Sequence, residues 1–228
     1  MTERFAVYYA PAIESALWAR AAAWLGRDAA TGAELPAGGG RDAERIFAVT
    51  QSARRYGFHA TLKAPMALAE GFSRAALEVA VAAFAERTAA VRIEKLVLRS
   101  LGGFLALVPD VQDDALTGLA QAVVEAFEPF RAPMSEKDRA KRMASGLTAR
   151  QADYLDRFGY PYVGEEFRFH MTLTDRLKAE DAAVVTDAAE KFFADFTGRP
   201  LAVDRLVLFH EAAPGAPFTR LASFALKG

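Results

Sequence analysis

The chain has 228 residues, of which 52% are hydrophobic, so its composition is that of a compact globular protein rather than a disordered one. Its 28 Lys and Arg against 29 Asp and Glu give a net charge of -1, which argues against a protein that binds duplex nucleic acid by bulk electrostatics. The absence of cysteine excludes disulfides, thiolate metal sites and cysteine nucleophiles. Because it has neither a signal-peptide pattern nor an apolar run of membrane-spanning length, we expect a cytoplasmic protein without a membrane segment.

Strands and helices alternate in the first half of the chain. Residues 5–9 predict a strand, and the next helix has Pro11 in its first turn, ends at Gly26 and carries one apolar face (Ile13, Leu17, Ala21, Trp24, Leu25). Residues 26–45 are rich in Gly and Pro and predict a mobile surface loop. A strand at 56–63, a helix capped by Ser73, and strands at 91–98 and 103–108 follow.

The second half has a similar order with a longer connection. An amphipathic helix over 113–127 precedes a segment, 131–166, that has no counterpart in the first half. This segment contains a helix from Thr148 to Phe158 and several cations (Lys137, Arg139, Lys141, Arg142, Arg150). It fits a solvated helical hairpin, and its place before the next strand also fits a basic flap over a cleft. A strand at 167–174, a helix over 181–196 and strands near 201–209 and 218–226 complete the chain.

The two halves resemble each other in sequence. Residues 91–98 match residues 201–208 position by position, and the run 104–109 before a helix matches the run 5–11 before a helix. These matches predict a single bilobal domain over 1–228, with pseudo-repeat halves of about 1–110 and 111–228 and a helical insert at 131–166.

Two of the three histidines lie in the same tetrapeptide pattern. The pattern occurs as His59-Ala60-Thr61-Leu62 and again as His170-Met171-Thr172-Leu173. Because strand side chains alternate between two faces, each histidine shares a face with the threonine two positions later. A cation shares that face in each strand, Lys63 in the first and Arg168 in the second. Two such faces opposite each other would form a complete site.

This pair of motifs suits acid-base chemistry on a phosphodiester. An imidazole titrates near neutral pH, so one histidine can take a proton from water while the other protonates the departing oxygen. The hydroxyls of Thr61 and Thr172 can donate to the phosphoryl oxygens, and Lys63 or Arg168 can offset the ester's charge. Two histidines alone are a poor metal site, so we expect no metal and no cofactor.

Other residues are weaker candidates for the same site. Arg55 has the phase of His59 and is a further phosphate-binding candidate. His210 ends the strand near 201–209 and could line the edge of a cleft, as could Tyr160 and Tyr162.

The residues around both histidines carry a family resemblance. The strings Arg55-Tyr56-Gly57-Phe58-His59-Ala60-Thr61-Leu62-Lys63 and Glu166-Phe167-Arg168-Phe169-His170-Met171-Thr172-Leu173-Thr174 resemble the two-histidine (2H) phosphoesterase superfamily, which includes the bacterial RNA 2',5'-ligase-like proteins. With Gly159-Tyr160-Pro161-Tyr162-Val163 before the second string, they look like a branch often encoded beside carbon-phosphorus lyase genes for phosphonate breakdown. The resemblance covers nearly the whole chain.

The resemblance implies a fold, a reaction and residue roles. The fold is a bilobal α+β structure in which two mainly antiparallel sheets face a central cleft, with helices packed outside. The reaction is metal-independent opening of a cyclic phosphate on ribose, or a related phosphoester transfer. His59 and His170 become the acid-base pair, and Thr61 and Thr172 the phosphate binders.

We expect a cyclic phosphodiesterase that acts on a small phosphorylated ribose or nucleotide, with duplex nucleic acid an unlikely partner. Two alternatives remain open: a catalytically silent module that binds a nucleotide or phosphosugar, and an RNA end-processing enzyme. The near symmetry of the repeats leaves the acid and the base unassigned, and the sequence names no protein partner.

Overall fold

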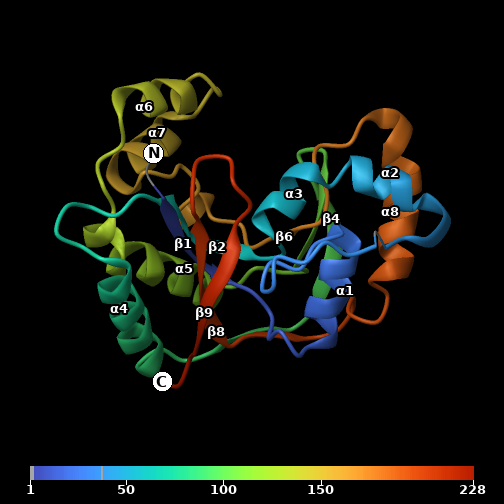
Figure 1. Cartoon of the computed structure of the whole chain (residues 1–228), viewed down its shortest axis with the longest axis horizontal. Coiled ribbons are helices and arrows are strands. Elements are labelled where there is room, and N and C mark those ends of the chain that lie inside the picture. The colour runs from blue at the N-terminus through green and yellow to red at the C-terminus, as the bar shows by residue number, and fades with distance from the viewer. Residues whose placement is uncertain (1–2, 37) are drawn as a thin grey trace.

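Two antiparallel sheets form the centre of the molecule, with helices around them (Figure 1). The computed structural model describes residues 3–36 and 38–228. In spatial order, the first sheet consists of β2 (Ala60–Met66), β1 (Arg4–Tyr9), β8 (Arg205–Glu211) and β9 (Thr219–Ala225). The second consists of β4 (Leu96–Leu101), β5 (Phe104–Pro109) and β6 (Met171–Thr172), and β3 (Val91–Ile93) pairs separately with β7 (Leu201–Val203). The expected α+β fold class with mainly antiparallel sheets is confirmed.

Local sequence explains where the main helices begin and end. Among the described helices of ten or more residues, four start at residues whose side chains accept from the first free backbone N–H groups: Ser15 before α1 (Ala16–Leu25), Ser73 before α4 (Arg74–Glu86), Asp113 before α5 (Asp114–Ala126) and Thr148 before α7 (Ala149–Phe158). Gly26 ends α1 with a φ of 68°, a left-handed conformation that glycine adopts without strain. The remaining helices are α2 (Ala43–Ala48), α3 (Gln51–Tyr56), α6 (Glu136–Met143) and α8 (Ala179–Phe192).

Several boundaries differ from the expectation. Pro11 lies before the first helix rather than in its first turn, because Ser15 supplies the cap. The loop expected at 26–45 ends early, since residues 43–48 form α2; its residue 37 lies outside the described residues. The strand expected at 56–63 begins only at Ala60, because α3 occupies residues 51–56. The strand expected at 167–174 is restricted to Met171–Thr172.

The two sheets share part of their strand order. β1 and β5 each pair on one side with the strand that follows a histidine, β2 and β6, and on the other side with β8 and β4. β3 and β7, the matching segments of the repeat, pair antiparallel with Val91 opposite Val203 and Ile93 opposite Leu201. Each sheet takes strands from both halves of the sequence: β8 and β9 complete the first sheet, and β4 and β5 belong to the second.

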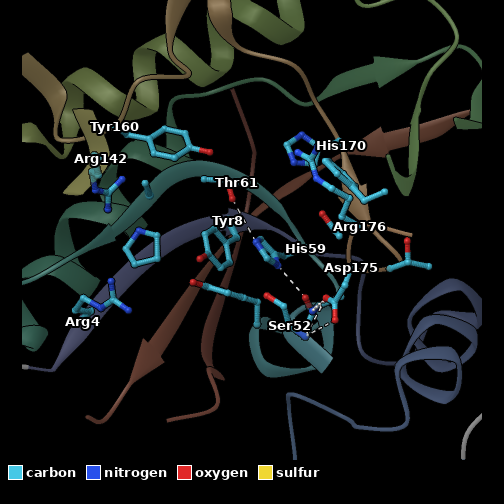
Figure 2. Close-up of a pocket in the computed structure, with 18 residues that line it drawn as sticks. Arg4, Tyr8, Ser52, His59, Thr61, Arg142, Tyr160, His170, Asp175 and Arg176 are labelled. Carbon is cyan, nitrogen blue, oxygen red and sulfur yellow. Dashed lines mark hydrogen bonds between the residues drawn. The ribbon is translucent and has the colours of Figure 1, made fainter. Parts of the chain in front are cut away.

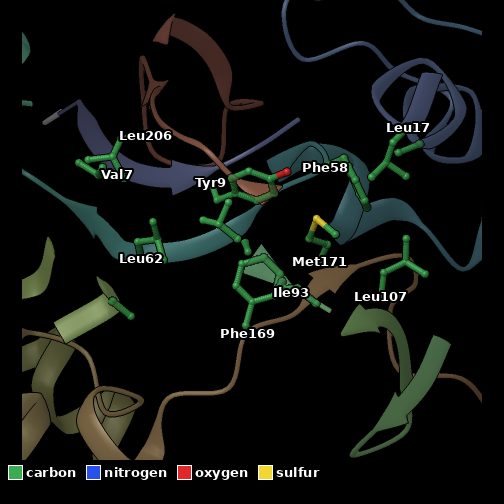
Figure 3. Packing of buried hydrophobic residues seen from close by; sticks show 14 of the residues in the cluster. Val7, Tyr9, Leu17, Phe58, Leu62, Ile93, Leu107, Phe169, Met171 and Leu206 are labelled. Atoms are coloured by element: carbon green, nitrogen blue, oxygen red, sulfur yellow. The ribbon is translucent and has the colours of Figure 1, made fainter. Parts of the chain in front are cut away.

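The main hydrophobic core lies between the two sheets (Figure 3). Tyr9 and Leu62 enter it from the first sheet, and Phe169 and Met171 enter it from the second motif. The rings of Tyr9 and Phe169 are 5.8 Å apart. This packing places the apolar faces of both motifs in one core, so the polar faces open on the other side. Among residues 3–36 and 38–228, no helix combines the length and apolar character needed to cross a membrane.

Candidate active site

One cleft of about 450 Å³ brings the two motifs together (Figure 2). His59 lies between α3 and β2 of the first sheet, and His170 lies immediately before β6 of the second. Both histidines line this cleft, together with Thr61 and Thr172. Residues from two distant parts of the sequence therefore converge on one space.

The backbone fixes the orientation of His59. Its Nδ1 lies 2.8 Å from the carbonyl oxygen of Gly57, which can only accept, so Nδ1 carries the proton and Nε2 of the neutral ring keeps its lone pair. That Nε2 is 3.3 Å from Oγ1 of Thr61. Gly57 has a φ of 77°, and a Cβ there would lie 2.6 Å from Cβ of Ala29, so this turn requires glycine. The His59 ring stacks on Tyr8 with centroids 3.8 Å apart.

His170 is held by the same kind of contact. Its Nδ1 lies 2.7 Å from the carbonyl oxygen of Arg168, again two residues earlier in the chain. The ring is tilted against Phe104 at a centroid distance of 5.7 Å, which is a looser contact than the stack of His59 on Tyr8. Both imidazoles therefore leave their Nε2 atoms free of the backbone, and the ring of His59 makes the closer aromatic contact.

Burial lowers the pKa of both imidazoles. Desolvation in the cleft wall brings the pKa of His59 from 6.5 to about 4; the hydrogen bond to Gly57 opposes this change, and the charge of a protonated His170 adds to it. The pKa of His170 is also lowered, mainly by burial. Both rings are therefore neutral at pH 7 in the ligand-free protein.

Further side chains that were not predicted from the sequence line the cleft. They are Arg4, Tyr8, Ser52, Phe104, Asp175 and Arg176. The position of Tyr8 on β1, opposite Thr61 of β2, was the signal that could have identified it, because cross-strand neighbours share a face. Burial holds the pKa of Tyr8 well above its usual value, so its hydroxyl stays protonated.

Asp175 connects the two motifs. Its carboxylate accepts hydrogen bonds from the backbone N–H of Ser52, at 3.0 Å, and of Ala53, at 3.2 Å. These are the second and third residues of α3, whereas Thr50 at the N-cap makes no side-chain hydrogen bond of this kind. Asp175 comes two residues after the His170 motif, and α3 leads to His59. A residue next to one motif therefore caps the helix that precedes the other histidine.

Lys63 does not reach the cleft, contrary to the prediction. Tyr8 of β1 pairs with Thr61 of β2, and the adjacent residue Val7 pairs with Lys63. Strand β2 therefore contains one extra residue between these two pairs. This bulge breaks the alternation that would have put Thr61 and Lys63 on one face. Lys63 is 2% exposed, donates to the carbonyl of Val124 at 3.0 Å and forms a salt bridge with Glu128. It serves the packing of α5 against β2.

The two predicted phosphate-binding arginines are also engaged elsewhere. Arg55 forms a salt bridge of 2.7 Å with the buried Glu211. Arg168 is exposed and its guanidinium donates to the backbone carbonyls of Glu165, at 2.6 Å, and Phe167, at 2.7 Å. Neither belongs to the described residues that line the cleft.

The three remaining candidates have different positions. His210 stacks on Phe5 with centroids 4.9 Å apart, and its Nε2 is 2.6 Å from a carboxylate oxygen of Glu3, away from the cleft. Tyr160 lines the cleft that holds the two histidines. Tyr162 packs edge-on against Tyr160, is 46% exposed and lines an adjoining cleft. Within the described ranges, no three His, Asp or Glu side chains are grouped as metal ligands.

Sequence comparison connects this chain to a family and to longer proteins. A family model described as "Protein of unknown function (DUF1045)" matches residues 61–219. A "Ribose 1,5-bisphosphate phosphokinase PhnN" of Janthinobacterium sp. (strain Marseille) is 43% identical over 222 residues, which cover 94% of this chain and 49% of that protein. The protein of the same name in Laribacter hongkongensis (strain HLHK9) is 39% identical, with coverages of 94% and 50%. The chain thus spans about half the length of the curated relatives it matches.

Among solved structures, the chain is similar to Escherichia coli LigT complexed with 3'-AMP, with 14% identity, a TM-score of 0.46 and full coverage of both chains. It is also similar to TT0787 of Thermus thermophilus, with 13% identity, a TM-score of 0.48 and coverages of 99% and 98%.

Proposed function

This chain belongs to the DUF1045 family, and we propose that it is a phosphoesterase that opens a cyclic phosphate on a small ribose-derived substrate. The observation that carries the proposal is the convergence of His59 and His170, each with its Nδ1 bound to a backbone carbonyl, on one cleft. Two mainly antiparallel sheets with helices around them are the fold that the resemblance to 2H phosphoesterases implies. The reaction needs no metal, because the two imidazoles supply both the base and the acid.

We assign the base to His59. The Gly57 carbonyl and the stacked Tyr8 ring hold its neutral imidazole, and Nε2 takes a proton from the attacking water once the Thr61 hydroxyl turns from Nε2 to the phosphoryl group. The water oxygen bonds to phosphorus as the bond from phosphorus to one ribose oxygen breaks. His170, protonated once an anionic phosphate raises its pKa, gives its Nε2 proton to that oxygen. The product is a phosphate monoester with a free hydroxyl.

The threonines suit the charge that builds on the phosphoryl group. Thr61 and Thr172 both line the cleft, and their hydroxyls can donate to its non-bridging oxygens in the transition state. We propose Arg176, which lines the cleft with its side chain beside Gly103, as the source of positive charge in place of Lys63 and Arg168.

The names of the relatives support a role in phosphonate metabolism and a phosphorylated ribose as the substrate class. Their names describe a kinase, but those proteins are about twice as long as the matched region. This chain contains no Gly-Lys dipeptide and therefore no Walker-type phosphate loop. We accordingly propose phosphoester cleavage rather than phosphoryl transfer from ATP for this part.

The test uses the purified protein after EDTA treatment and a panel of 2',3'-cyclic nucleotides and ribose 1,2-cyclic phosphates. We expect ring opening of at least one member, and losses of roughly 10²- to 10⁴-fold in His59→Ala and His170→Ala because each removes one proton transfer. His210→Ala is the matched control, since this histidine lies outside the cleft, and it should keep wild-type activity.

Failure of every cyclic phosphate in that panel would overturn the proposal. Tight phosphosugar binding that survives both histidine replacements, without turnover, would identify a binding module instead. Preference for oligonucleotide ends with a steep salt dependence would identify an RNA-processing enzyme.

A further inference from the structure

A second cleft of about 570 Å³ adjoins the candidate active site. The two clefts share Arg4, Pro65, Arg142 and Tyr160. From there, the adjoining cleft runs along the start of the segment 131–166, between residues 131–135 and the turn at 159–162. A ligand seated at the histidines therefore has an open route toward the helical insert.

The adjoining cleft contains two cations that are not neutralised by an ion pair. Its other two arginines are paired, Arg4 with Glu211 and Arg131 with Glu128. For Lys141 and Arg142 the described part of the chain supplies no carboxylate within salt-bridge distance, and Asp138 is the one carboxylate among the described residues that line this cleft. An anion entering here meets an excess of positive charge.

Arg142 lies at the junction of the two clefts, beside Tyr160. Figure 2 shows both side chains at one end of the candidate active site, with His170 at the other. Burial raises the pKa of the Tyr160 hydroxyl to about 12, so it remains a hydrogen-bond donor at neutral pH. A fixed hydroxyl donor next to a planar guanidinium matches the oxygens of a phosphate group.

We propose that Arg142 and Tyr160, with Lys141 beside them, form a subsite for a second phosphate carried by the same substrate. This inference rests on the proposed function, and it narrows the substrate class to a small sugar with two phosphate groups, one cyclic and one terminal. Arg142 and Tyr160 line the same cleft of about 450 Å³ as the two histidines, so one small molecule can contact both groups. Its role is recognition: it binds the terminal phosphate while the histidines act on the cyclic one.

The test compares a ribose cyclic phosphate with the same compound phosphorylated on its 5-hydroxyl. A charge-assisted contact to the second phosphate predicts that kcat/KM is about tenfold to a hundredfold higher for the second compound, because its KM is lower. Arg142→Gln should reduce this ratio to near one, and Arg142→Lys should keep part of it because a lysine retains the charge but not the planar fork. Arg150→Gln is the matched control on the same insert, exposed and outside both clefts, and should keep the full ratio.

A ratio near one in the wild-type protein would overturn the subsite, as would an equal loss on both compounds in Arg142→Gln with folding intact by circular dichroism. The binding affinities of ribose 1,5-bisphosphate and ribose 5-phosphate, measured calorimetrically, test the subsite without turnover. A bisphosphate preference that depends on Arg142 supports the subsite even if no cyclic phosphate is opened, in which case the proposed reaction alone fails. If a dinucleotide binds more strongly than either sugar phosphate, the substrate is an oligonucleotide and the proposal of a small sugar substrate fails.

Discussion

At the scale of single residues, the setting of His59 sets the pH range in which the site works. The ring is buried against Tyr8, and its pKa is lowered to about 4, while the pKa of His170 is also below 6.5. Because the pKa of both rings is lowered, the free protein holds a protonated acid only on the acid side of the ordinary imidazole pKa of 6.5. We predict that kcat/KM has its optimum on the acid side of pH 6.5, and that kcat has a higher optimum because bound phosphate raises both pKa values.

A pH-rate profile checks this prediction, and an NMR titration of the ring nitrogens assigns each limb to its histidine. A kcat/KM optimum above about pH 7, or a His59 that titrates near its ordinary value of 6.5, would contradict it.

The lowered pKa of His59 also affects folding. Because folded His59 resists a proton that the unfolded chain accepts near 6.5, stability is lost as pH falls from about 6.5 to about 4. His59→Gln, which does not titrate, should flatten that part of a plot of Tm against pH.

The residue scale also shows what sequence reasoning can reach. The histidines and threonines were predictable, because a repeated pattern on an alternating strand fixes which side chains share a face. Lys63 and Arg55 were misplaced for two physical reasons. A bulge in β2 turns Lys63 away, and the carboxylates that pair with Lys63 and Arg55, the half-buried Glu128 and the buried Glu211, are distant in sequence.

At the scale of elements, the relation between α3 and the second motif decides how the two histidines face each other. Local sequence did not predict α3, a short polar helix, because part of its capping comes from Asp175, far along the chain. The capping contacts also bind the segment that carries His59 to the one that carries His170. We therefore expect Asp175 to act as a positioning residue as well as a helix cap.

We predict that Asp175→Ala costs about 1 kcal/mol of stability, the usual cost of a lost cap, and lowers kcat although both histidines are intact. Asp175→Asn should restore much of both, since an amide oxygen also accepts from backbone N–H groups. Ser73→Ala removes the cap of α4, far from the cleft, and should cost similar stability without changing kcat. Equal effects of Asp175→Ala and Ser73→Ala on kcat would show that Asp175 has no positioning role.

At the scale of the whole molecule, the sheets do not follow the two halves of the sequence. The sequence halves suggested that each lobe is one half, whereas each sheet contains strands from both. Strand pairing across the repeat, such as β1 with β8, is a contact between distant segments and leaves no signal in either segment alone.

This topology predicts the behaviour of a divided chain. Fragments 1–110 and 111–228 should each lack a complete first sheet, because β1 and β2 are in one fragment and β8 and β9 in the other. We expect that neither fragment alone unfolds cooperatively in denaturant. An equimolar mixture should regain a cooperative unfolding transition and should bind ligand in the cleft between the two histidines. Cooperative unfolding of either fragment by itself would contradict this view of the two halves.

The pairing of β1 with β8 also has a consequence during synthesis. Arg4 and Glu211, which meet across these strands, are 207 positions apart, so one edge of the apolar β1 has no strand partner until nearly the whole chain has been made. The second sheet is complete in sequence once Thr172 has emerged from the ribosome. The lobe that holds His170 can thus form first, while the unpaired edge of β1 stays open to aggregation until β8 arrives.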